Sequence, residues 1–486
     1  MGCATSPGRI RSQSPRPGWG HAGDEGAFTG EDRTRPYPGP VRRLLDALLA
    51  QVARVAVGLA TRRVEIIDGD RIPTGRPVLV VANHFNGFVD PLVVVAVLGH
   101  LPRFLAKATL WRLLPLRPLL ALAGIIPVHR RADSGGDLVL EQANRGSFDA
   151  AERALRRQQT VAIFPEGITH DEPRLASVRT GAARIALGAR ASGASGIVIV
   201  PIGLLFEDKV AIRTRVLARV GEPVDLDATA AELLGDGGTA DEENREAVRA
   251  LTDLLTDRLR QVTPDYDDRW EHAELSLAAD VALRPEPRAR HEPVPLVDRE
   301  RLAQRLARSP ELADVRSATR SYATRLHLTD VDDADLLAQG GIVGWARRLV
   351  TAGIGLGVGY LLLAPALAAA AIPALLVVLL GSLPTSPVSK GTVRVLGGFV
   401  LFLASWIAVA VAVAGSLVGR LAWVAYQIVG LLVALPILEY SYAWLRSTRS
   451  WWHLREHRAR VPELLEDRAV LVAAVEDASR PRRRSG

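Results

Sequence analysis

The sequence predicts an α/β domain with a mostly parallel central sheet, followed by a helical connector and C-terminal transmembrane helices. Three observations support this fold class. Between residues 41 and 265, short apolar runs alternate with segments of helical periodicity, which is typical of a parallel sheet covered by helices. A polar stretch rich in acids, Arg and Pro follows over residues 266–340. From about residue 345 the chain is almost wholly apolar in long segments, each near or above the roughly twenty residues that a spanning helix needs.

Composition narrows the classes of partner. The chain has 486 residues, 48% of them hydrophobic, and a net charge of +7. A basic surface can serve nucleic acid, anionic lipid or acidic small molecules. No nucleic-acid-binding module is recognisable, so we expect lipid or phosphate substrates and no nucleic acid. The only cysteine is Cys3, which excludes a disulfide within this chain and fits a reducing compartment.

The segments before the apolar region divide into three units. Residues 1–40 are rich in Gly, Pro, Ser and Arg, and we expect a disordered tail there. Residues 41–63 have apolar side chains at helical spacing, which fits either a core helix or an amphipathic helix lying on the bilayer. This helix opens the α/β domain of residues 41–265. The polar connector of 266–340 reads as helical, with a Pro-rich break at 284–295.

Within the α/β domain, apolar runs predict strands and periodic segments predict helices. The predicted strands are Val64–Ile67, Val78–Ala82, the run from Gly124 that ends in the cations Arg130 and Arg131, Thr160–Phe164, Ile197–Val200 and Arg213–Val220. The predicted helices are one capped by Ser147 and ending near Gln159, then Ala182–Arg190, then Thr239–Gln261.

The membrane region of residues 345–445 contains two to three hydrophobic segments: Leu349–Gly381, Val395–Gly415 and Leu421–Leu438. A buried soluble bundle is the alternative, but such low charge favours the membrane. Flanking arginines place the α/β domain and the charged tail of 446–486, with its basic end, in the cytoplasm. An even number of crossings is then required, and we favour the first segment, interrupted by Pro365 and Pro373, as the one that does not cross.

The stretch most suggestive of chemistry follows the strand Val78–Ala82. This strand ends at Asn83 and His84, and Asp90 comes six residues after the histidine, too far for one helical face. The two side chains can meet only if the chain turns back, as Asn86 and Gly87 allow. A carboxylate on one ring nitrogen would fix the tautomer of His84 and make it a general base. Because no serine or cysteine is obviously paired with it, the base would act on a substrate hydroxyl.

Other strand ends carry charged or flexible residues where ligands collect in α/β sheets. Arg130 offers a forked cation suited to phosphate. Glu166 and Gly167 follow the strand Thr160–Phe164, and glycine lets backbone approach a ligand closely. Each residue alone also has a structural explanation: a satisfied histidine, a solvated cation, or a carboxylate at a helix start.

The order of these motifs resembles the glycerolipid acyltransferase family. Four blocks carry the resemblance over roughly residues 60–225: Asn83-His84 with Asp90, Gly124-Ile-Ile-Pro-Val-His-Arg130, Phe164-Pro165-Glu166-Gly167, and Val200-Pro201-Ile202-Gly203. The resemblance implies that His84 is the general base and that Asp90 supports it. It also implies that Asn83, Arg130, Glu166 and Gly167 serve substrate binding, mainly of a phosphorylated acceptor, and that Pro201 lies on the acyl-donor side.

Two departures from the family pattern point to one branch. Five residues separate His84 from Asp90, where four are usual. The third block continues Ile168-Thr169-His170-Asp171 in place of Thr-Arg-Ser. Both features resemble the branch of fungal-type glycerol-3-phosphate and dihydroxyacetone-phosphate acyltransferases with C-terminal membrane segments. In that branch His170 becomes a candidate additional contact to the acceptor.

The resemblance implies a membrane-bound O-acyltransferase of phospholipid and glycerolipid biosynthesis. It would move a fatty acyl group from acyl-CoA or acyl carrier protein to a hydroxyl of a glycerol-phosphate-type acceptor. We expect no cofactor and no metal, membrane lipids as partners, and an integral position in the cell membrane with the catalytic domain facing the cytoplasm. Two alternatives stay open: a catalytically inactive lipid-binding membrane scaffold, and an acyl thioesterase that uses water in place of the acceptor.

Overall fold

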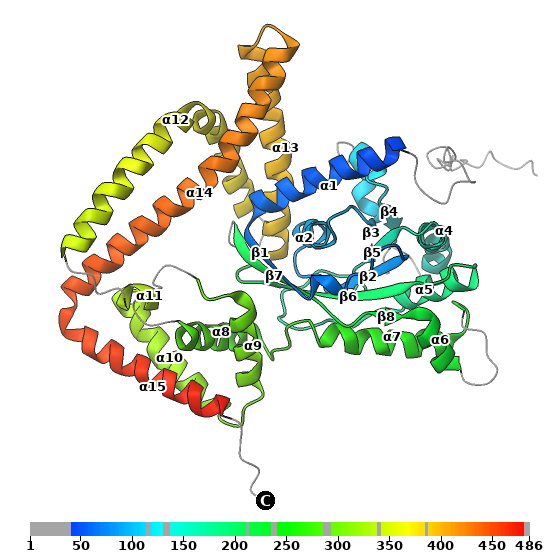
Figure 1. Cartoon of the computed structure of the whole chain (residues 1–486), viewed down its shortest axis with the longest axis horizontal. Coiled ribbons are helices and arrows are strands. Elements are labelled where there is room, and N and C mark those ends of the chain that lie inside the picture. The colour runs from blue at the N-terminus through cyan, green and yellow to red at the C-terminus, as the bar shows by residue number, and fades with distance from the viewer. Residues whose placement is uncertain are drawn as a thin grey trace, which may run out of the picture.

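The computed structural model describes residues 40–112, 117–129, 137–209, 213–234, 241–284, 293–337, 342–383 and 387–480. These residues form an α/β domain, a helical bundle and a set of long apolar helices (Figure 1). Almost all of the expected disordered tail, residues 1–39, lies outside the described residues. The same holds for the basic end of the chain after residue 480.

The α/β domain is built on one eight-stranded sheet in the order β1-β7-β6-β2-β5-β3-β4, with β8 paired to β6. Neighbouring strands are parallel except where β6 meets β7 and β8. The prediction of a mostly parallel sheet is therefore confirmed. The strands are β1 (Thr61–Ile67), β2 (Val78–Ala82), β3 (Arg103–Lys107), β4 (Ile126–Val128), β5 (Thr160–Ile163), β6 (Val198–Phe206), β7 (Thr214–Val220) and β8 (Val224–Asp225).

Helices cover both faces of this sheet. On one face, α1 and α2 pack against β2 and β6, and on the other α4, α5 and α7 do so (Figure 1). The strand β2 is buried along its whole length, because it lies in the middle of the sheet between two apolar layers. The helices are α1 (Pro40–Ala60), α2 (Val89–Leu98), α3 (Arg117–Leu122), α4 (Asp137–Arg156), α5 (Gly181–Ala191), α6 (Leu226–Leu234) and α7 (Arg245–Arg260), with one-turn 3₁₀ segments at Gly69–Arg71 and Ala108–Arg112.

Three elements differ from the sequence prediction, each for a local reason. The strand β3 was not predicted, since Arg103–Lys107 alternates little and adjoins a long apolar run. Ser147 does not cap a helix: it lies inside α4, where its hydroxyl donates to the carbonyl of Pro127. The helix α7 begins at Arg245, because the side chain of Asn244 accepts hydrogen bonds from the two amides that follow Arg245.

The helix α1 has two apolar faces. Ala50, Ala53 and Val57 are buried against the domain, whereas larger side chains face outward. Val41 is 80% exposed and Leu44 is 73% exposed, and Leu48 and Val52 continue the same row at helical spacing. The helix therefore contributes small residues to the core and leaves an apolar stripe uncovered.

The polar connector and the chain's end together make the helical bundle. Its members are α8 (Arg269–Leu283), α9 (Leu296–Ala307), α10 (Leu312–Thr329), α11 (Asp333–Leu336) and α15 (Val461–Ser479), the last preceded by a 3₁₀ turn at Arg458–Arg460. Tyr322 and Leu471 are fully buried in its core. Residues that were expected to form a charged tail thus include a packed helix, because Leu464, Leu471 and Val475 complete an apolar face.

Three apolar helices link the last two bundle elements: α12 (Ile342–Ser382), α13 (Pro387–Val413) and α14 (Leu417–Glu456). Among the described residues, two helical segments are long and apolar enough to cross a bilayer, Leu363–Ser382 and Leu417–Glu456. The segment Gly397–Val413 is apolar but shorter. That segment is only part of α13, which has 27 residues, so the expectation that the first apolar segment does not cross stays a prediction. Pro365 and Pro373 lie inside a continuous α12.

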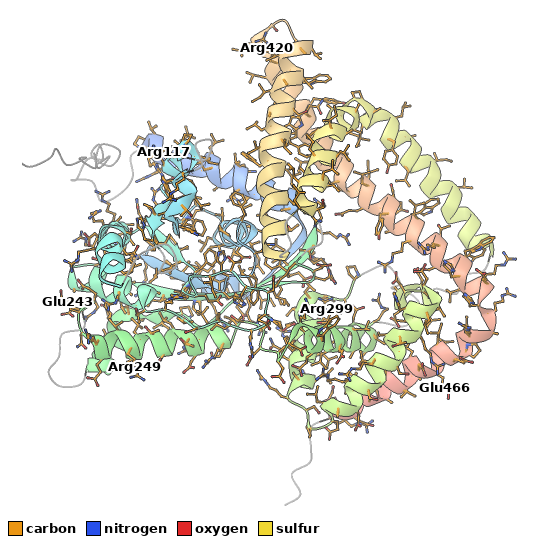
Figure 2. The ribbon with its side chains drawn as sticks, turned by 180° about the vertical axis from the view of Figure 1, so that it is seen from behind. Arg117, Glu243, Arg249, Arg299, Arg420 and Glu466 are labelled. Carbon is orange, nitrogen blue, oxygen red and sulfur yellow. The ribbon has the colours of Figure 1, made fainter. Side chains whose placement is uncertain are left out.

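Ion pairs fasten the other parts to the α/β domain. Glu439 of α14 contacts Arg213, and it lies 3.5 Å from the guanidinium of Arg62. On the bundle side, Glu207 accepts hydrogen bonds from Arg215 at 2.6 Å and from Arg299 at 2.9 Å. Figure 2 shows Arg299 at the boundary between the bundle and the sheet. The apolar helices and the bundle are therefore held against the domain that carries the sheet.

Two carboxylates, the buried Glu152 and the half-buried Glu242, lie between α4 and the segment leading to α7. Glu152 packs over Gly188 of α5, and Glu242 approaches the same glycine. Burial of Glu152 and the nearby charge of Glu242 raise the pKa of Glu152 to about 7. Because the raised pKa disfavours the charged form in the folded state, stability is full below about pH 4.5 and falls as the pH rises toward 7.

We predict that Glu152→Gln raises the free energy of unfolding by about 1 kcal/mol at pH 8, with a smaller gain at pH 5. Thermal or denaturant unfolding in detergent at the two pH values would measure this. The matched control is Glu243→Gln, an exposed carboxylate of the same segment (Figure 2), which should give no pH-dependent gain. A gain for Glu152→Gln that is the same at both pH values would contradict the assignment.

Candidate active site

The candidate site lies where the neighbouring parallel strands β2 and β5 end, beside the middle of β6. Val81 of β2 pairs with Ile163 of β5 on one side and with Pro201 of β6 on the other. Residues three positions beyond each pair therefore come to the same edge of the sheet. This register places His84 next to Glu166, in keeping with the rule that ligand sites form at the carboxyl ends of such strands.

His84 and Asp90 meet as the sequence predicted. The chain turns after β2 and enters α2, whose first turn carries Asp90. The Nδ1 atom of His84 lies 2.9 Å from Oδ2 of Asp90, and the backbone N–H of Asn86 donates to the same oxygen at 2.7 Å. A carboxylate can only accept here, so Nδ1 carries the proton and the lone pair is on Nε2.

The carboxylate of Asp90 is shielded from solvent. Its side chain is completely buried, and its Oδ1 atom has no hydrogen-bond partner among the described residues. Burial raises the pKa of Asp90, while the hydrogen bond and charge of His84 act in the opposite direction. The carboxylate is therefore stabilised mainly by His84 and by the amide of Asn86, and gains most when the imidazole becomes positively charged.

The imidazole of His84 is fixed from the side by Phe164. The two rings stack at 4.3 Å between centroids with an angle of 17° between their planes. The His84 side chain is 8% exposed, and the hydrogen bond described for its ring is the one from Nδ1 to Asp90. The imidazole is thus oriented by two neighbours, and Nε2 is its basic nitrogen.

Glu166 joins the loops that follow β2 and β5. Its Oε1 atom accepts the backbone N–H of His84 at 2.7 Å. Its Oε2 atom accepts the ring Nε2–H of His170 at 2.6 Å and the backbone N–H of Ala176 at 2.7 Å. The side chain is only 1% exposed. Both oxygens are thus engaged within the protein, so the carboxylate acts on the position of His84 and of the loop.

Gly167 adopts a conformation that the turn after β5 requires. Its φ is +68°, in the left-handed region that favours glycine. A Cβ at this position would come within 3.0 Å of Nε of Arg179. The same Nε atom donates to the carbonyl of Glu166 at 3.2 Å. Arg179 therefore covers the turn, a role that the sequence did not single out.

Asn83 and Pro201 support the strand ends. The amide group of Asn83 donates to the carbonyl of Leu204 at 3.0 Å and accepts its N–H at 2.7 Å, so the side chain continues the pairing of β2 with β6. Pro201 lies where β6 changes partner from β8 to β7, and its carbonyl accepts the N–H of Gly221 at 2.8 Å. A proline in a central strand is tolerated there because the missing N–H faces this gap in the ladder.

The described structure brings together most of the residues that the sequence proposed. His84, Asp90, Glu166, Gly167 and His170 form one connected group, and the ring of Phe85 contacts His170 edge-on at 5.2 Å. Arg130 lies outside the described residues. Sequence reasoning missed Lys209, whose ammonium lies 4.2 Å from the centroid of Phe85. The rarity of lysine could have drawn attention to Lys209, since the chain has lysine only at positions 107, 209 and 390.

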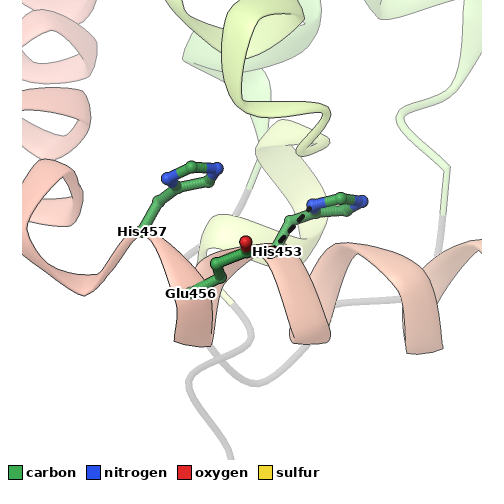
Figure 3. Close-up of side chains that lie close together, drawn as sticks. All are labelled: His453, Glu456 and His457. Carbon is green, nitrogen blue, oxygen red and sulfur yellow. Dashed lines mark ion pairs between the residues drawn. The ribbon is translucent and has the colours of Figure 1, made fainter.

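A separate group could in principle hold a metal. His453, Glu456 and His457 lie at the end of α14, and their ligand atoms are within 4.8 Å of one another (Figure 3). The group already has protein contacts: Arg449 donates to His453, which also lies 3.5 Å from Asp330. Because the neighbouring guanidiniums oppose a bound cation, we assign no metal to it.

Comparison with known proteins matches this domain to a family. The family described as Acyltransferase matches residues 63–205. Glycerol-3-phosphate O-acyltransferase 2 of Saccharomyces cerevisiae is 34% identical over 128 residues, which cover 26% of this chain and 16% of that protein. The human 1-acyl-sn-glycerol-3-phosphate acyltransferase beta is 29% identical over 128 residues, covering 26% of this chain and 43% of that protein.

Among solved structures, the 1-acyl-sn-glycerophosphate acyltransferase PlsC from Thermotoga maritima is similar, with a TM-score of 0.32 and 20% identity. The alignment covers 48% of this chain and 85% of that one. The chain spans about a sixth of the length of the first curated relatives that it matches. The family match lies within the α/β domain.

We predict that Glu166→Gln lowers the free energy of unfolding by about 1–3 kcal/mol. The amide nitrogen cannot accept the hydrogen bonds from Ala176 and His170, so a buried donor loses its partner. The melting temperature in detergent measures the effect. Glu172→Gln, in the same loop but exposed, is the control and should melt like the wild type. If Glu166→Gln melts at the wild-type temperature, the carboxylate does not hold the two loops.

Proposed function

From the premise that residues 63–205 form an acyltransferase-family domain, distantly similar to glycerol-3-phosphate and lysophosphatidate acyltransferases, we propose a glycerolipid acyltransferase activity for this protein. It would transfer a fatty acyl group from an acyl thioester, acyl-CoA or acyl carrier protein, to a hydroxyl of a phosphorylated glycerol-type acceptor. Glycerol 3-phosphate, dihydroxyacetone phosphate and lysophosphatidate are the candidate acceptors.

The observation that carries the proposal is the His84–Asp90 pair with its basic Nε2. A histidine with its Nδ1–H on a buried carboxylate is suited to take a proton and to stabilise the resulting charge. The groups described in contact with its ring are Asp90, whose carboxylate is bound to Nδ1–H, and Phe164; neither is a serine or cysteine that the base could activate. The substrate hydroxyl is therefore the natural nucleophile.

The proposed reaction proceeds in two steps. Nε2 of His84 removes the proton of the acceptor hydroxyl as its oxygen forms a bond to the thioester carbonyl carbon. The tetrahedral intermediate then collapses, the carbon–sulfur bond breaks, and the imidazolium returns the proton to the thiolate. One ester and one thiol result. Asp90 favours the imidazolium between these steps, because the charge is opposite and close.

The remaining residues receive different roles. Glu166 and Asn83 position the loops, since their polar atoms are bound within the protein. We assign Gly167, His170 and Arg130 to the acceptor and Pro201 to the donor side. This assignment follows the order of the sequence blocks. The backbone turn at Gly167, next to Glu166, supports it.

A membrane setting follows from the apolar surfaces. The two candidate spans are mostly uncovered by protein, which is unusual for helices of a soluble core. The outward stripe of α1 adds a third apolar surface, suited to lie in the bilayer interface. We propose an integral protein of the cell membrane whose catalytic domain faces the cytoplasm. The site would then lie next to the bilayer, into which long-chain thioesters and lipid products partition.

Two alternatives predict different observations. A lipid-binding scaffold would bind acceptor or lipid but release no thiol. A thioesterase would release thiol without any acceptor, because water would take the place of the hydroxyl while the same base works. The intact His84–Asp90 contact disfavours the scaffold.

We predict that His84→Ala abolishes acceptor-dependent thiol release from palmitoyl-CoA, and that Asp90→Asn lowers kcat by about 10²-fold or more. The amide cannot stabilise the imidazolium. Detergent-solubilised protein is assayed with each of the three acceptors and without acceptor, and thermal melting checks that both variants fold. If the folded His84→Ala variant retains the wild-type rate, the proposed function is wrong.

A further inference from the structure

Lys209 brings a positive charge to the wall of the site from a third strand. It follows the end of β6 by three residues. Its ammonium lies over the ring of Phe85, 4.2 Å from the centroid, and 3.4 Å from the carbonyl oxygen of His170. Phe85 follows His84 directly, and His170 is bound to Glu166. The cation thus borders both loops that form the site.

Within the part of the chain that the structure describes, four carboxylates attract the ammonium but none forms a direct ion pair with it. No described carboxylate lies within 4.0 Å of it, and its hydrogen bond to His170 is long. Asp171, Asp90, Glu166 and Glu172 attract it from farther away, yet burial lowers the pKa of Lys209. An ammonium has three donors, so at least one is free for a ligand.

A partly buried cation of this kind is costly unless an anion accompanies it. Both oxygens of Glu166 are occupied by other donors, and Oδ2 of Asp90 is bound to His84 and Asn86. The Oδ1 atoms of Asp90 and Asp171 are buried without a described partner, yet neither forms an ion pair with the ammonium. An anionic substrate group that reaches the ammonium directly is a further candidate.

We propose that Lys209 binds the phosphate of the acceptor and thereby places the acceptor hydroxyl at His84. The choice of ligand rests on the proposed function. Lysine binds phosphate as a compact point charge with rotatable donors, which suits a small monoester. The ring of Phe85, which follows the base His84 in the chain, lies directly beside the ammonium.

The test compares Lys209→Met, which keeps the stem and removes the charge, with Lys209→Arg, which keeps the charge. Steady-state kinetics with glycerol 3-phosphate or lysophosphatidate should show at least a tenfold higher KM for the acceptor in Lys209→Met. We expect kcat and the KM for palmitoyl-CoA to change less than threefold, and Lys209→Arg to recover most of the loss. Arg249→Met, an exposed cation of α7 (Figure 2), is the control and should match the wild type.

Three outcomes overturn the inference: a fall in kcat alone, a rise only in the KM for the thioester, or a loss that Lys209→Arg does not restore. The last would mean that Lys209 pairs with Asp171 for structural reasons. Calorimetric titration of the detergent-solubilised full chain with glycerol 3-phosphate separates this inference from the proposed function. The wild type could bind glycerol 3-phosphate without turnover, while Lys209→Met binds it tenfold more weakly. This result would support the phosphate site and reject the acyltransferase activity. No difference in binding between the two proteins would reject the site.

Discussion

The carboxylate of Glu166 is the interaction on which the geometry of the site depends. It lies at the end of β5 yet anchors the backbone of His84 at the end of β2, and its other oxygen holds His170 and Ala176 of the following loop. Two loops without regular structure are thereby fixed to one buried charge. Hydrogen bonds to a charged acceptor are stronger than neutral ones, so three of them can keep irregular backbone in one conformation.

This arrangement separates the tasks of the acidic residues. Asp90 contacts the imidazole of His84, whereas Glu166 contacts only backbone and the ring of His170. Under the proposed mechanism, the substrate supplies the nucleophilic hydroxyl and the protein holds the base in position. The apolar helices and the outward face of α1 add exposed apolar surface.

Much of the fold followed from the sequence because its signals are local. The apolar run Val78–Ala82 predicted the central strand, and the His84–Asp90 spacing predicted that a turn would bring the two together. The strand β3 and the early start of α4 were missed, since Arg103–Lys107 has weak alternation and Gly146-Ser147 inside α4 resembles a helix start. Lys209 could not be placed from spacing alone, because its neighbours Phe85 and His170 come from other loops. Likewise, the internal bonding of Glu166 shows only when three segments are in place.

The proposed mechanism requires that His84 act directly on the substrate hydroxyl, without an acyl-enzyme. Intact-mass spectrometry of the full chain after incubation with palmitoyl-CoA, with and without acceptor, tests this requirement. We expect unmodified protein in both cases and thiol release only when acceptor is present. Protein that carries a palmitoyl group at a stoichiometric level, and loses it when acceptor is added, would contradict the mechanism and require a nucleophile on the protein.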